Sequence, residues 1–328
     1  MNNNKIYSLM KSIWHATYIR LRDWFNNWKY RRYWNEHTVH NGREHADKIF
    51  YIIRRREVYT GLLSDLITYV YKTKLAVDAG YIPIIDMQTS ENIYLKKDEV
   101  GRINAWEYYF KQPGGYSLKD IEKARNVIRG SGYTEECFPY LDVNYVLNKV
   151  GDFSVYQSIT KRYFHLSSEA AEIVESFYNH NFMGQRMLGV LCRGTDYTQN
   201  KPSRHPVQPS LEEVFEKIKE VTEKYKCTKI FLGTEDVGIY RRFKEKYGDT
   251  VITNRKSFIK YSGEQSIGKV IKNGTDNLKE EGMEYLATIA LLARCDCFVG
   301  GHTSGTVGVM LMNDHFEYKY IFNLGVYP

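Results

Sequence analysis

From residue 187 onward, the sequence alternates short apolar runs with longer stretches whose apolar residues recur at helical spacing. Strands that alternate with helices of this length favour an α/β fold with a parallel sheet. Ser210 and Glu213 form a capping box before the first of these helices. We predict strands at residues 187–192, 228–233, 250–253, 296–300 and 319–324. We predict helices at residues 211–225, 236–247, 280–294 and 304–312.

Three of these predicted strands end in clusters of polar residues and glycines, which begin at Arg193, at Thr234 and at Gly300. In an open parallel sheet, groups that follow the carboxyl ends of adjacent strands meet in one crevice. An arginine there suits a diphosphate, because its planar guanidinium makes paired, charge-assisted hydrogen bonds. The turn Gly300–Thr306 opens a helix, and amides at a helix N-terminus also bind anions. The sequence therefore predicts one crevice for a phosphate-bearing ligand.

Each cluster also has a purely structural interpretation. Arg193 could form an ion pair with Asp196, and Asp196 could instead bind a ribose hydroxyl or act as a base. Thr234 could cap the helix that follows it, and the glycine-rich turn could cap its own helix. His205 lies in the predicted loop 194–209, which is either an active-site loop or an exposed crossover, and histidine is the side chain that titrates nearest neutral pH. The sequence leaves these alternatives open.

The first half of the chain contains a second alternating pattern. A strand predicted at residues 49–53 precedes three arginines, and Gly61 then opens a helix that ends near residue 79. A strand at residues 81–86 completes a β-α-β unit with short connections. Further helices are expected at residues 117–129 and at residues 168–180, the latter inside a connecting region.

The N-terminal segment is basic and aromatic. Residues 1–56 carry twelve lysines and arginines against four acids, whereas the whole chain has a net charge of +7, so the remainder is about neutral. This distribution does not indicate a nucleic-acid-binding protein. Residues 1–40 hold four of the five tryptophans and fit an amphipathic helix. Such a helix either packs on the body of the protein or lies on an anionic membrane surface.

The composition is that of a globular protein outside the secretory route. No apolar run comes near the ~20 residues that span a bilayer, and the first residues lack the features of a secretory signal. Five cysteines without a C-x-x-C pair predict reduced thiols in a cytosolic protein. We therefore expect a cytoplasmic protein, held at the inner face of the membrane if residues 1–40 contact lipid.

Several ligand-binding motifs are absent. The sequence has no Gly-x-x-x-x-Gly-Lys-Ser/Thr loop, which argues against an ATPase, and no strand-anchored Gly-x-Gly-x-x-Gly with a following acid, which argues against a dinucleotide dehydrogenase. It also has no Asp-x-Asp pair of the kind that holds a metal against a sugar-nucleotide diphosphate. We therefore expect neither a metal nor a cofactor, with arginine and the helix dipole neutralising the phosphates.

The three clusters resemble the motifs of the fucosyltransferase-like superfamily of GT-B glycosyltransferases, which includes the α-1,6-, Nod-factor and protein O-fucosyltransferases. Residues 191–196, Leu-Cys-Arg-Gly-Thr-Asp, match a strand ending in His-x-Arg-Arg-x-Asp. Residues 233–236, Gly-Thr-Glu-Asp, match Ala-Thr-Asp-Asp, and residues 298–306 match a strand followed by a serine-containing turn. The similarity covers about residues 187–312.

The resemblance implies two Rossmann-like domains whose parallel sheets face a cleft. Residues 1–45 would be a basic, aromatic helical segment, residues 46–180 the acceptor domain and residues 181–328 the nucleotide-sugar domain. The implied activity is inverting, metal-independent transfer of fucose from GDP-fucose to a glycan hydroxyl. A cell-surface polysaccharide or a lipid-linked oligosaccharide is the expected acceptor, which would place the protein in polysaccharide biosynthesis.

The resemblance and the residue types together suggest roles for single residues. Arg193 would be the main contact to the diphosphate, with Asp196 and His205 as candidates for the base. The acceptor is expected between the domains, near Gly61, Trp106 and Glu107. The expected donor-binding residues are Gly194, Thr195, Thr234, Asp236, Glu284, Gly301, Thr303, Ser304, Gly305 and Thr306.

Three departures from the family pattern affect how the donor is recognised. Leu191 replaces the histidine that helps to bind guanine and ribose, and Gly194 replaces the second arginine. The carboxylate expected in the helix before the third motif falls near Thr288, with Glu284 one turn earlier. Two alternatives therefore stay open: a transferase for another nucleotide sugar on the same fold, and a non-catalytic protein that binds glycans or membranes.

Overall fold

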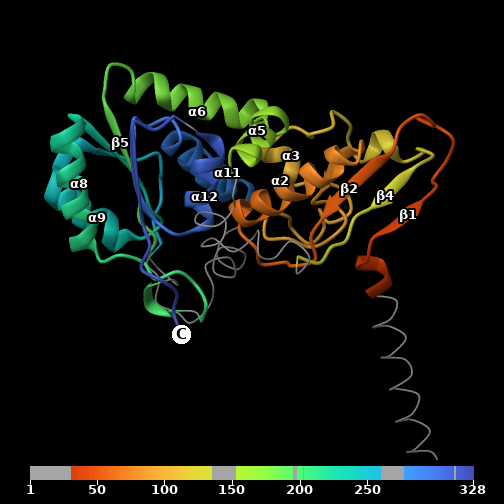
Figure 1. Cartoon of the computed structure of the whole chain (residues 1–328), viewed down its shortest axis with the longest axis horizontal. Helices are drawn as coiled ribbons and strands as arrows, with labels where there is room; N and C mark the ends of the chain where they lie inside the picture. Colours follow the sequence, from red (N-terminus) through yellow and green to blue (C-terminus); the bar gives the residue numbers. More distant parts are fainter. Residues whose placement is uncertain (1–30, 135–152, 195–197, 202, 260–276, 314) are drawn as a thin grey trace, which may run out of the picture.

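The computed structural model describes residues 31–134, 153–194, 198–201, 203–259, 277–313 and 315–328. These residues contain a four-stranded and a five-stranded sheet. Figure 1 shows the two sheets toward opposite ends of the long axis, with helices α2, α5, α11 and α12 between them. The predicted α/β class is confirmed, whereas the arrangement of two domains around a cleft and the domain boundaries stay predictions.

The N-terminal sheet has the order β1-β4-β2-β3. Strand β2 (Phe50–Arg54) is parallel to β3 (Ile82–Asp86) and to β4 (Val127–Arg129), and β1 (His37–Val39) is antiparallel to β4. Helix α2 (Leu62–Asp78) connects β2 to β3. The predicted β-α-β unit is therefore confirmed.

The helix predicted over residues 117–129 is wrong. Ser117 donates its backbone N–H to Asp120, as a capping residue would, but only the 3₁₀ turn η1 (Lys119–Ile121) follows. The chain then forms β4, whose Val127 is fully buried and pairs with Phe50 of β2. A strand forms there because it satisfies the backbone groups along the open edge of β2, which outweighs the local helical propensity.

The end of the predicted N-terminal helical segment joins the first sheet. Residues 31–34 are helical, but His37–Val39 form β1 rather than continuing the helix. Trp34 is buried at 5% exposure and packs on the body of the protein. Residues 1–30, which carry most of the predicted membrane-binding helix, lie outside the described residues. In the described part of the chain, no helix has both the length and the apolar character to cross a bilayer.

Among the described residues, one short α-helix lies between β3 and β4 of the first sheet, and two helices lie between β4 and the second sheet. The short α3 (Trp106–Tyr109) was not predicted, nor was α5 (Phe153–Tyr163), whereas α6 (Ser168–Asn181) agrees with the helix expected at 168–180. Ser167 caps α6 by accepting a hydrogen bond from the Ala170 N–H. The connecting region is thus more helical than its sequence indicates.

The C-terminal sheet is parallel throughout and has the order β7-β6-β5-β8-β9. Each predicted strand and helix of this half is present, and the Ser210–Glu213 capping box forms. The helices are α8 (Leu211–Tyr225), α9 (Val237–Tyr247), α11 (Leu278–Leu292) and α12 (Ser304–Met312). The strands are β5 (Met187–Leu191), β6 (Lys229–Gly233), β7 (Val251–Ile252), β8 (Cys297–Gly301) and β9 (Tyr318–Phe322).

Alternate side chains of this sheet enter two different cores. Leu188 and Val190 of β5 pack with α8 and α9 on one face, whereas Met187 and Leu191 belong to the core that contains α11 and α12. Four of the five cysteines fall in the described residues, and all four are free and buried, as predicted: Cys192, Cys227, Cys295 and Cys297.

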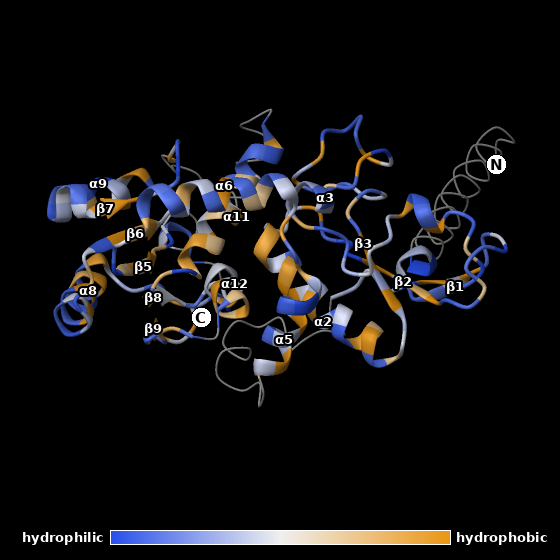
Figure 2. Cartoon of the chain, turned by 90° about the horizontal axis from the view of Figure 1, so that it is seen from above, coloured by the Kyte–Doolittle hydropathy of each residue, from blue (hydrophilic) through white to orange (hydrophobic). Residues whose placement is uncertain are grey.

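The core that contains α11 and α12 also includes buried residues from the first half of the chain, such as those of α2. Figure 2 shows apolar stretches of α2 and α12 near the centre of the molecule. A Cβ atom on Gly308 of α12 would lie 2.3 Å from Leu63 of α2, and a Cβ atom on Gly282 would lie 2.3 Å from the Tyr109 hydroxyl. Because only glycine permits these close approaches, the two halves are fitted tightly to one another.

Candidate functional site

The carboxyl end of β5 lies at the point where the strand order of the C-terminal sheet reverses. The chain runs outward from β5 through β6 to β7, and then returns to β8 on the other side of β5. Open α/β sheets bind ligands at such a switch point. Leu191 pairs with Gly233 on one side and with Gly300 on the other. The three predicted clusters are therefore neighbours at one edge of the sheet, as the sequence predicts.

Arg193 follows β5 at this edge and forms an ion pair with Glu235. The Arg193 Nη1 atom lies 3.3 Å from the Glu235 Oε1 atom, and the two side chains are only 12% and 9% exposed. The same carboxylate accepts a hydrogen bond from the Gly194 N–H at 3.3 Å. Asp196, the partner considered from the sequence, lies outside the described residues together with Thr195. Sequence reasoning missed the role of Glu235.

Asp236 caps the helix that follows β6. Its Oδ1 atom accepts hydrogen bonds from the backbone N–H groups of Gly238 at 2.7 Å and Ile239 at 3.0 Å. A residue of this cluster therefore caps the helix, as predicted, but the capping residue is Asp236 and not Thr234. The buried Thr234 side chain instead accepts from the Asp236 N–H. A Cβ atom on Gly194 would lie 2.7 Å from Asp236, so only glycine fits here without a shift.

The glycine-rich turn after β8 caps its own helix. Thr303 accepts a hydrogen bond from the Thr306 N–H at 3.1 Å, and the Thr306 hydroxyl donates to the Gly301 carbonyl at 2.5 Å. Both threonine side chains are buried. Gly305 packs closely against the Tyr285 hydroxyl, and Ser304 is half-buried at the helix start. The capping interpretation accounts for the threonines, and phosphate binding by this turn stays a prediction.

The loop before α8 is tied to both the β8 turn and the C-terminal tail. Buried Gln208 donates from Nε2 to the His302 carbonyl at 3.0 Å, and it packs on Gly301. The His205 carbonyl accepts from the Tyr327 N–H at 2.9 Å, while the His205 ring is exposed, with its Nδ1 atom 3.0 Å from the Ser203 carbonyl. Sequence reasoning missed Gln208, whose signal is an amide side chain between two prolines.

Glu284 anchors the segment that follows β7. Its Oε1 atom lies 3.2 Å from the Arg255 Nε atom, and its Oε2 atom accepts from the Lys256 N–H at 3.2 Å. Burial raises the pKa of the Glu284 carboxyl, and the Arg255 charge opposes that rise. The contacts of Glu284 are thus internal, and its predicted role in donor binding stays a prediction.

The predicted acceptor residues do not share one surface. Trp106 has no exposed surface, and it stacks on Phe110 with a centroid separation of 4.4 Å. Its burial is that of a core residue, so it offers no face to an acceptor. Glu107 is exposed and accepts from the Gln112 side chain at 3.0 Å. Gly61 is exposed and precedes α2 in an extended conformation, with no atom within 4 Å of a Cβ position.

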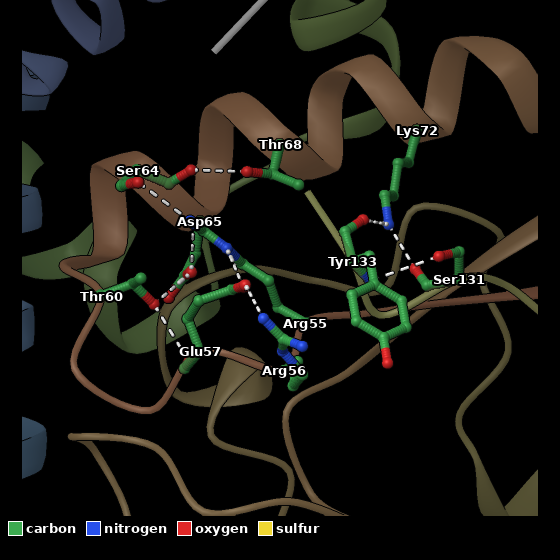
Figure 3. A network of polar contacts seen from close by, with 10 residues as sticks. All are labelled: Arg55, Arg56, Glu57, Thr60, Ser64, Asp65, Thr68, Lys72, Ser131 and Tyr133. Atoms are coloured by element: carbon green, nitrogen blue, oxygen red, sulfur yellow. Dashed lines mark hydrogen bonds and ion pairs between the residues drawn. The ribbon is translucent and has the colours of Figure 1, made fainter. Parts of the chain in front are cut away.

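Figure 3 shows a second polar cluster, which follows β2. Arg55 contacts Asp65 Oδ1 at 2.9 Å and Ser64 Oγ at 3.0 Å, and the Thr60 hydroxyl donates to Asp65 Oδ1 at 2.8 Å. Burial raises the pKa of Asp65 to about 6, with Arg55 acting in the opposite direction. This network, unforeseen from the sequence, joins the segment after β2 to the first turn of α2.

In the ranges that the structure describes, no group of three or more His, Cys, Asp or Glu side chains is placed to hold a metal ion. Glu235 and Asp236, which follow β6, each accept hydrogen bonds from backbone N–H groups. The chemistry that these side chains provide is therefore that of an arginine held in place beside two strand ends and a helix N-terminus.

Comparisons with known proteins find similarity in structure and not in sequence. No family model and no curated protein matches the chain. The apo form of POFUT1 superposes with a TM-score of 0.50 at 11% identity, covering 87% of this chain and 98% of that one. NodZ fucosyltransferase from Bradyrhizobium gives 0.48 at 16% identity, covering 81% and 94%. At this identity the likeness to POFUT1 concerns architecture, and this chain shares the overall fold of that protein.

Proposed function

We propose that this protein is an inverting glycosyltransferase that transfers fucose from GDP-fucose to a glycan hydroxyl. The observation that carries the proposal is the position of Arg193 just after β5, at the switch point of the C-terminal sheet, where Leu191 of β5 pairs with Gly300 of β8, the strand that leads into α12. A guanidinium and a helix N-terminus at one sheet edge are suited to a diphosphate, because both favour negative charge. The donor would therefore bind at the carboxyl ends of β5, β6 and β8.

The transfer needs a good leaving group and a deprotonated acceptor. The acceptor hydroxyl attacks the anomeric carbon from the face opposite GDP, through an oxocarbenium-like state, so the configuration inverts. Arg193 and the α12 N-terminus stabilise the charge that develops on departing GDP, which replaces the usual work of a metal ion. Asp196 and His205 are the candidates for the base that takes the hydroxyl proton.

The acceptor in this proposal is a cell-surface polysaccharide or a lipid-linked oligosaccharide. It would bind between the two halves, near Gly61 and Glu107, both of which are exposed. Trp106 would not contact the acceptor, because its ring has no exposed surface. The basic, aromatic residues 1–40 would hold the protein at the inner face of the membrane, close to such an acceptor.

Fold analogy gives weaker support than the site. POFUT1, whose overall fold this chain shares, has also been solved in complex with GDP. One fold hosts many functions, so this analogy raises the expectation of a GDP-sugar donor without establishing it. The proposal therefore depends on the chemistry of Arg193.

One observation favours a second candidate, a transferase for another nucleotide sugar. Leu191, which stands where the family motif has histidine, is 4% exposed and packs among Gly233, Gly300 and Gly305. An apolar side chain in the core gives no hydrogen bond to a nucleobase or ribose. The base of the donor is thus recognised by other groups, and a base other than guanine fits the same diphosphate site.

A donor screen separates these candidates. Thermal shift measurements with GDP-, UDP- and ADP-sugars should give the largest increase in Tm with GDP-fucose. A larger shift with a UDP- or ADP-sugar would favour the second candidate. The absence of both binding and donor hydrolysis, together with liposome binding that is lost on removal of residues 1–40, would favour a non-catalytic membrane-binding protein.

The Arg193→Ala variant tests the site itself. We expect donor hydrolysis and transfer to fall by about 10²–10³-fold, because a pre-positioned charge that stabilises the leaving group is lost. Arg242→Ala is the matched control, since Arg242 pairs with Glu212 on the exposed face of α8 and α9. Wild-type turnover in a folded Arg193→Ala protein would refute the proposed mechanism.

A further inference from the structure

The Glu235 carboxylate contacts both a side chain and a backbone N–H group of the segment that follows β5. Its Oε1 atom lies 3.3 Å from Arg193 Nη1 and 3.3 Å from the Gly194 nitrogen, so one carboxylate oxygen contacts two consecutive residues. The Glu235 carbonyl accepts from the Ile259 N–H at 2.8 Å, which fixes its own backbone. The carboxylate is therefore built on a residue that is itself anchored.

The backbone of the same segment, at Gly194, also packs closely against the residues that follow β6. Gly194 approaches Asp236 so closely that a Cβ atom would overlap it, and Asp236 is fixed in turn as the cap of α9. The pairing of Leu191 with Gly233 sets the two strand ends side by side just before this contact. The position of Arg193 is thus fixed by contacts with the residues that follow β6 as well as by its own strand, β5.

Burial makes this ion pair more than a surface contact. Glu235 is 7% exposed, so its carboxylate and the Arg193 guanidinium interact with little screening by solvent. An arginine side chain has many rotamers, and holding it in one of them before a ligand arrives removes that ordering cost from binding and catalysis. The negative charge of Glu235 also offsets the attraction of Arg193 for anions.

We propose that Glu235 is a positioning residue, which orients Arg193 and the Gly194 backbone toward a diphosphate and moderates how tightly that anion binds. The role in turnover rests on the proposed function, whereas the orientation of Arg193 does not. Glu235→Gln keeps the size of the side chain and an oxygen acceptor for the Gly194 N–H, but loses the charge. We therefore expect this substitution to affect the affinity for the diphosphate and the rate of turnover differently.

The experiment compares the full-length wild-type protein with Glu235→Gln, Glu235→Ala and the control Glu212→Gln. Glu212 also pairs with an arginine, Arg242, at 3.0 Å, but both side chains are exposed. Calorimetry with inorganic pyrophosphate gives Kd, donor hydrolysis gives kcat, and side-chain NMR of the Arg193 guanidinium reports whether its rotation is restricted. The Arg193 signal is assigned from its absence in Arg193→Lys.

We expect Glu235→Gln to bind pyrophosphate as tightly as the wild type or up to about tenfold more tightly, while kcat falls by about tenfold or more. Restricted rotation of Arg193 should be lost in Glu235→Gln and Glu235→Ala and retained in Glu212→Gln. Unchanged rotation of Arg193 in a folded Glu235→Gln protein would overturn the proposal, as would equal losses of affinity and turnover. The wild-type protein could instead show Arg193 rotation that Glu235 restricts, yet neither bind pyrophosphate nor hydrolyse a donor. That result would contradict the proposed function but support the role of Glu235 in orienting Arg193.

Discussion

Each half of the molecule has a buried parallel strand with an arginine at or just after its carboxyl end, at a switch point of the sheet, but the two arginines have different surroundings. Arg54 ends β2, which lies between β4 and β3, and its side chain donates to the carbonyls of Tyr33, Asn35 and Gly130. It is 1% exposed. Arg193 follows β5, is 12% exposed and contacts a carboxylate together with its glycine neighbour.

The difference shows what separates a structural arginine from a candidate ligand-binding one. At the first switch point, residues 33–35 supply two of the three carbonyl acceptors for Arg54, and the rings of Tyr33 and Trp34 pack on its guanidinium. Arg193 instead lies between the ends of β6 and β8, beside the start of a helix. An apolar strand that ends in arginine is therefore not sufficient to predict a ligand site.

The largest expected effect in this comparison is on stability at Arg54. Arg54→Met keeps much of the apolar volume but leaves three carbonyls without their donor, so the free energy of unfolding should fall by about 3 kcal/mol. Urea denaturation measures the change. Nucleotide binding by the folded protein should stay as in the wild type, the reverse of the pattern expected for Arg193→Ala. A loss of binding without a loss of stability would break the comparison.

The two glycines that follow these strands should also differ. Gly194→Ala places a Cβ atom 2.7 Å from Asp236, and we expect it to lower the free energy of unfolding by about 1–3 kcal/mol through overpacking. Gly61→Ala meets no atom within 4 Å, and the loss of a favourable capping residue is offset by a less flexible unfolded chain, so the change should stay within about 0.5 kcal/mol. Chemical denaturation of both variants tests this, and similar losses would contradict it.

A smaller expected effect is the pH dependence of the free energy of unfolding at the buried Asp65, in the cluster that follows β2. Its pKa in the folded protein is raised to about 6 from an ordinary 3.8, so folding favours the protonated carboxyl between these values. The stability of the wild type relative to Asp65→Asn should therefore increase by about 1–2 kcal/mol as the pH falls from 7 to 4, and decrease as the pH rises through 6.

Asp120→Asn provides the control of opposite sign. Hydrogen bonds from Ser117 lower the pKa of the Asp120 carboxyl in the folded state. That group favours folding when it is ionised, so the wild type should lose stability relative to Asp120→Asn on acidification. Denaturation curves at several pH values measure both differences. The same sign in both variants would contradict the roles assigned to burial and hydrogen bonding.

The sequence predicts the second half better than the first, for physical reasons. Helix α8 has a clear apolar period and its own capping box at Ser210, so local signals determine it. Strand β4 has only three residues, and it forms because β2 offers an edge, which no local signal records. The fold class and the strand ends of the C-terminal sheet could therefore be predicted, whereas short elements that depend on tertiary pairing could not.

The partners of site residues were the least predictable feature. Glu235 is 42 residues from Arg193 in the sequence and becomes its neighbour only through the register of β5 and β6, which no local pattern records, whereas the predicted pairing with Asp196 lies outside the described residues and stays a prediction. Trp106 was expected near an acceptor between the domains, yet Phe110, Tyr69 and Phe164 pack around it and bury its ring. Residue type can suggest chemistry, while contacts depend on the whole fold.

The close fit of Gly308 against Leu63 has a consequence for how this chain unfolds. The apolar residues of α12, including Val307 and Leu311, are buried in the core that both halves share. Severing the chain near residue 180 would uncover that helix and the side of α2 that faces it. Neither fragment would keep its fold without the other, and the intact protein should melt in one cooperative transition rather than half by half.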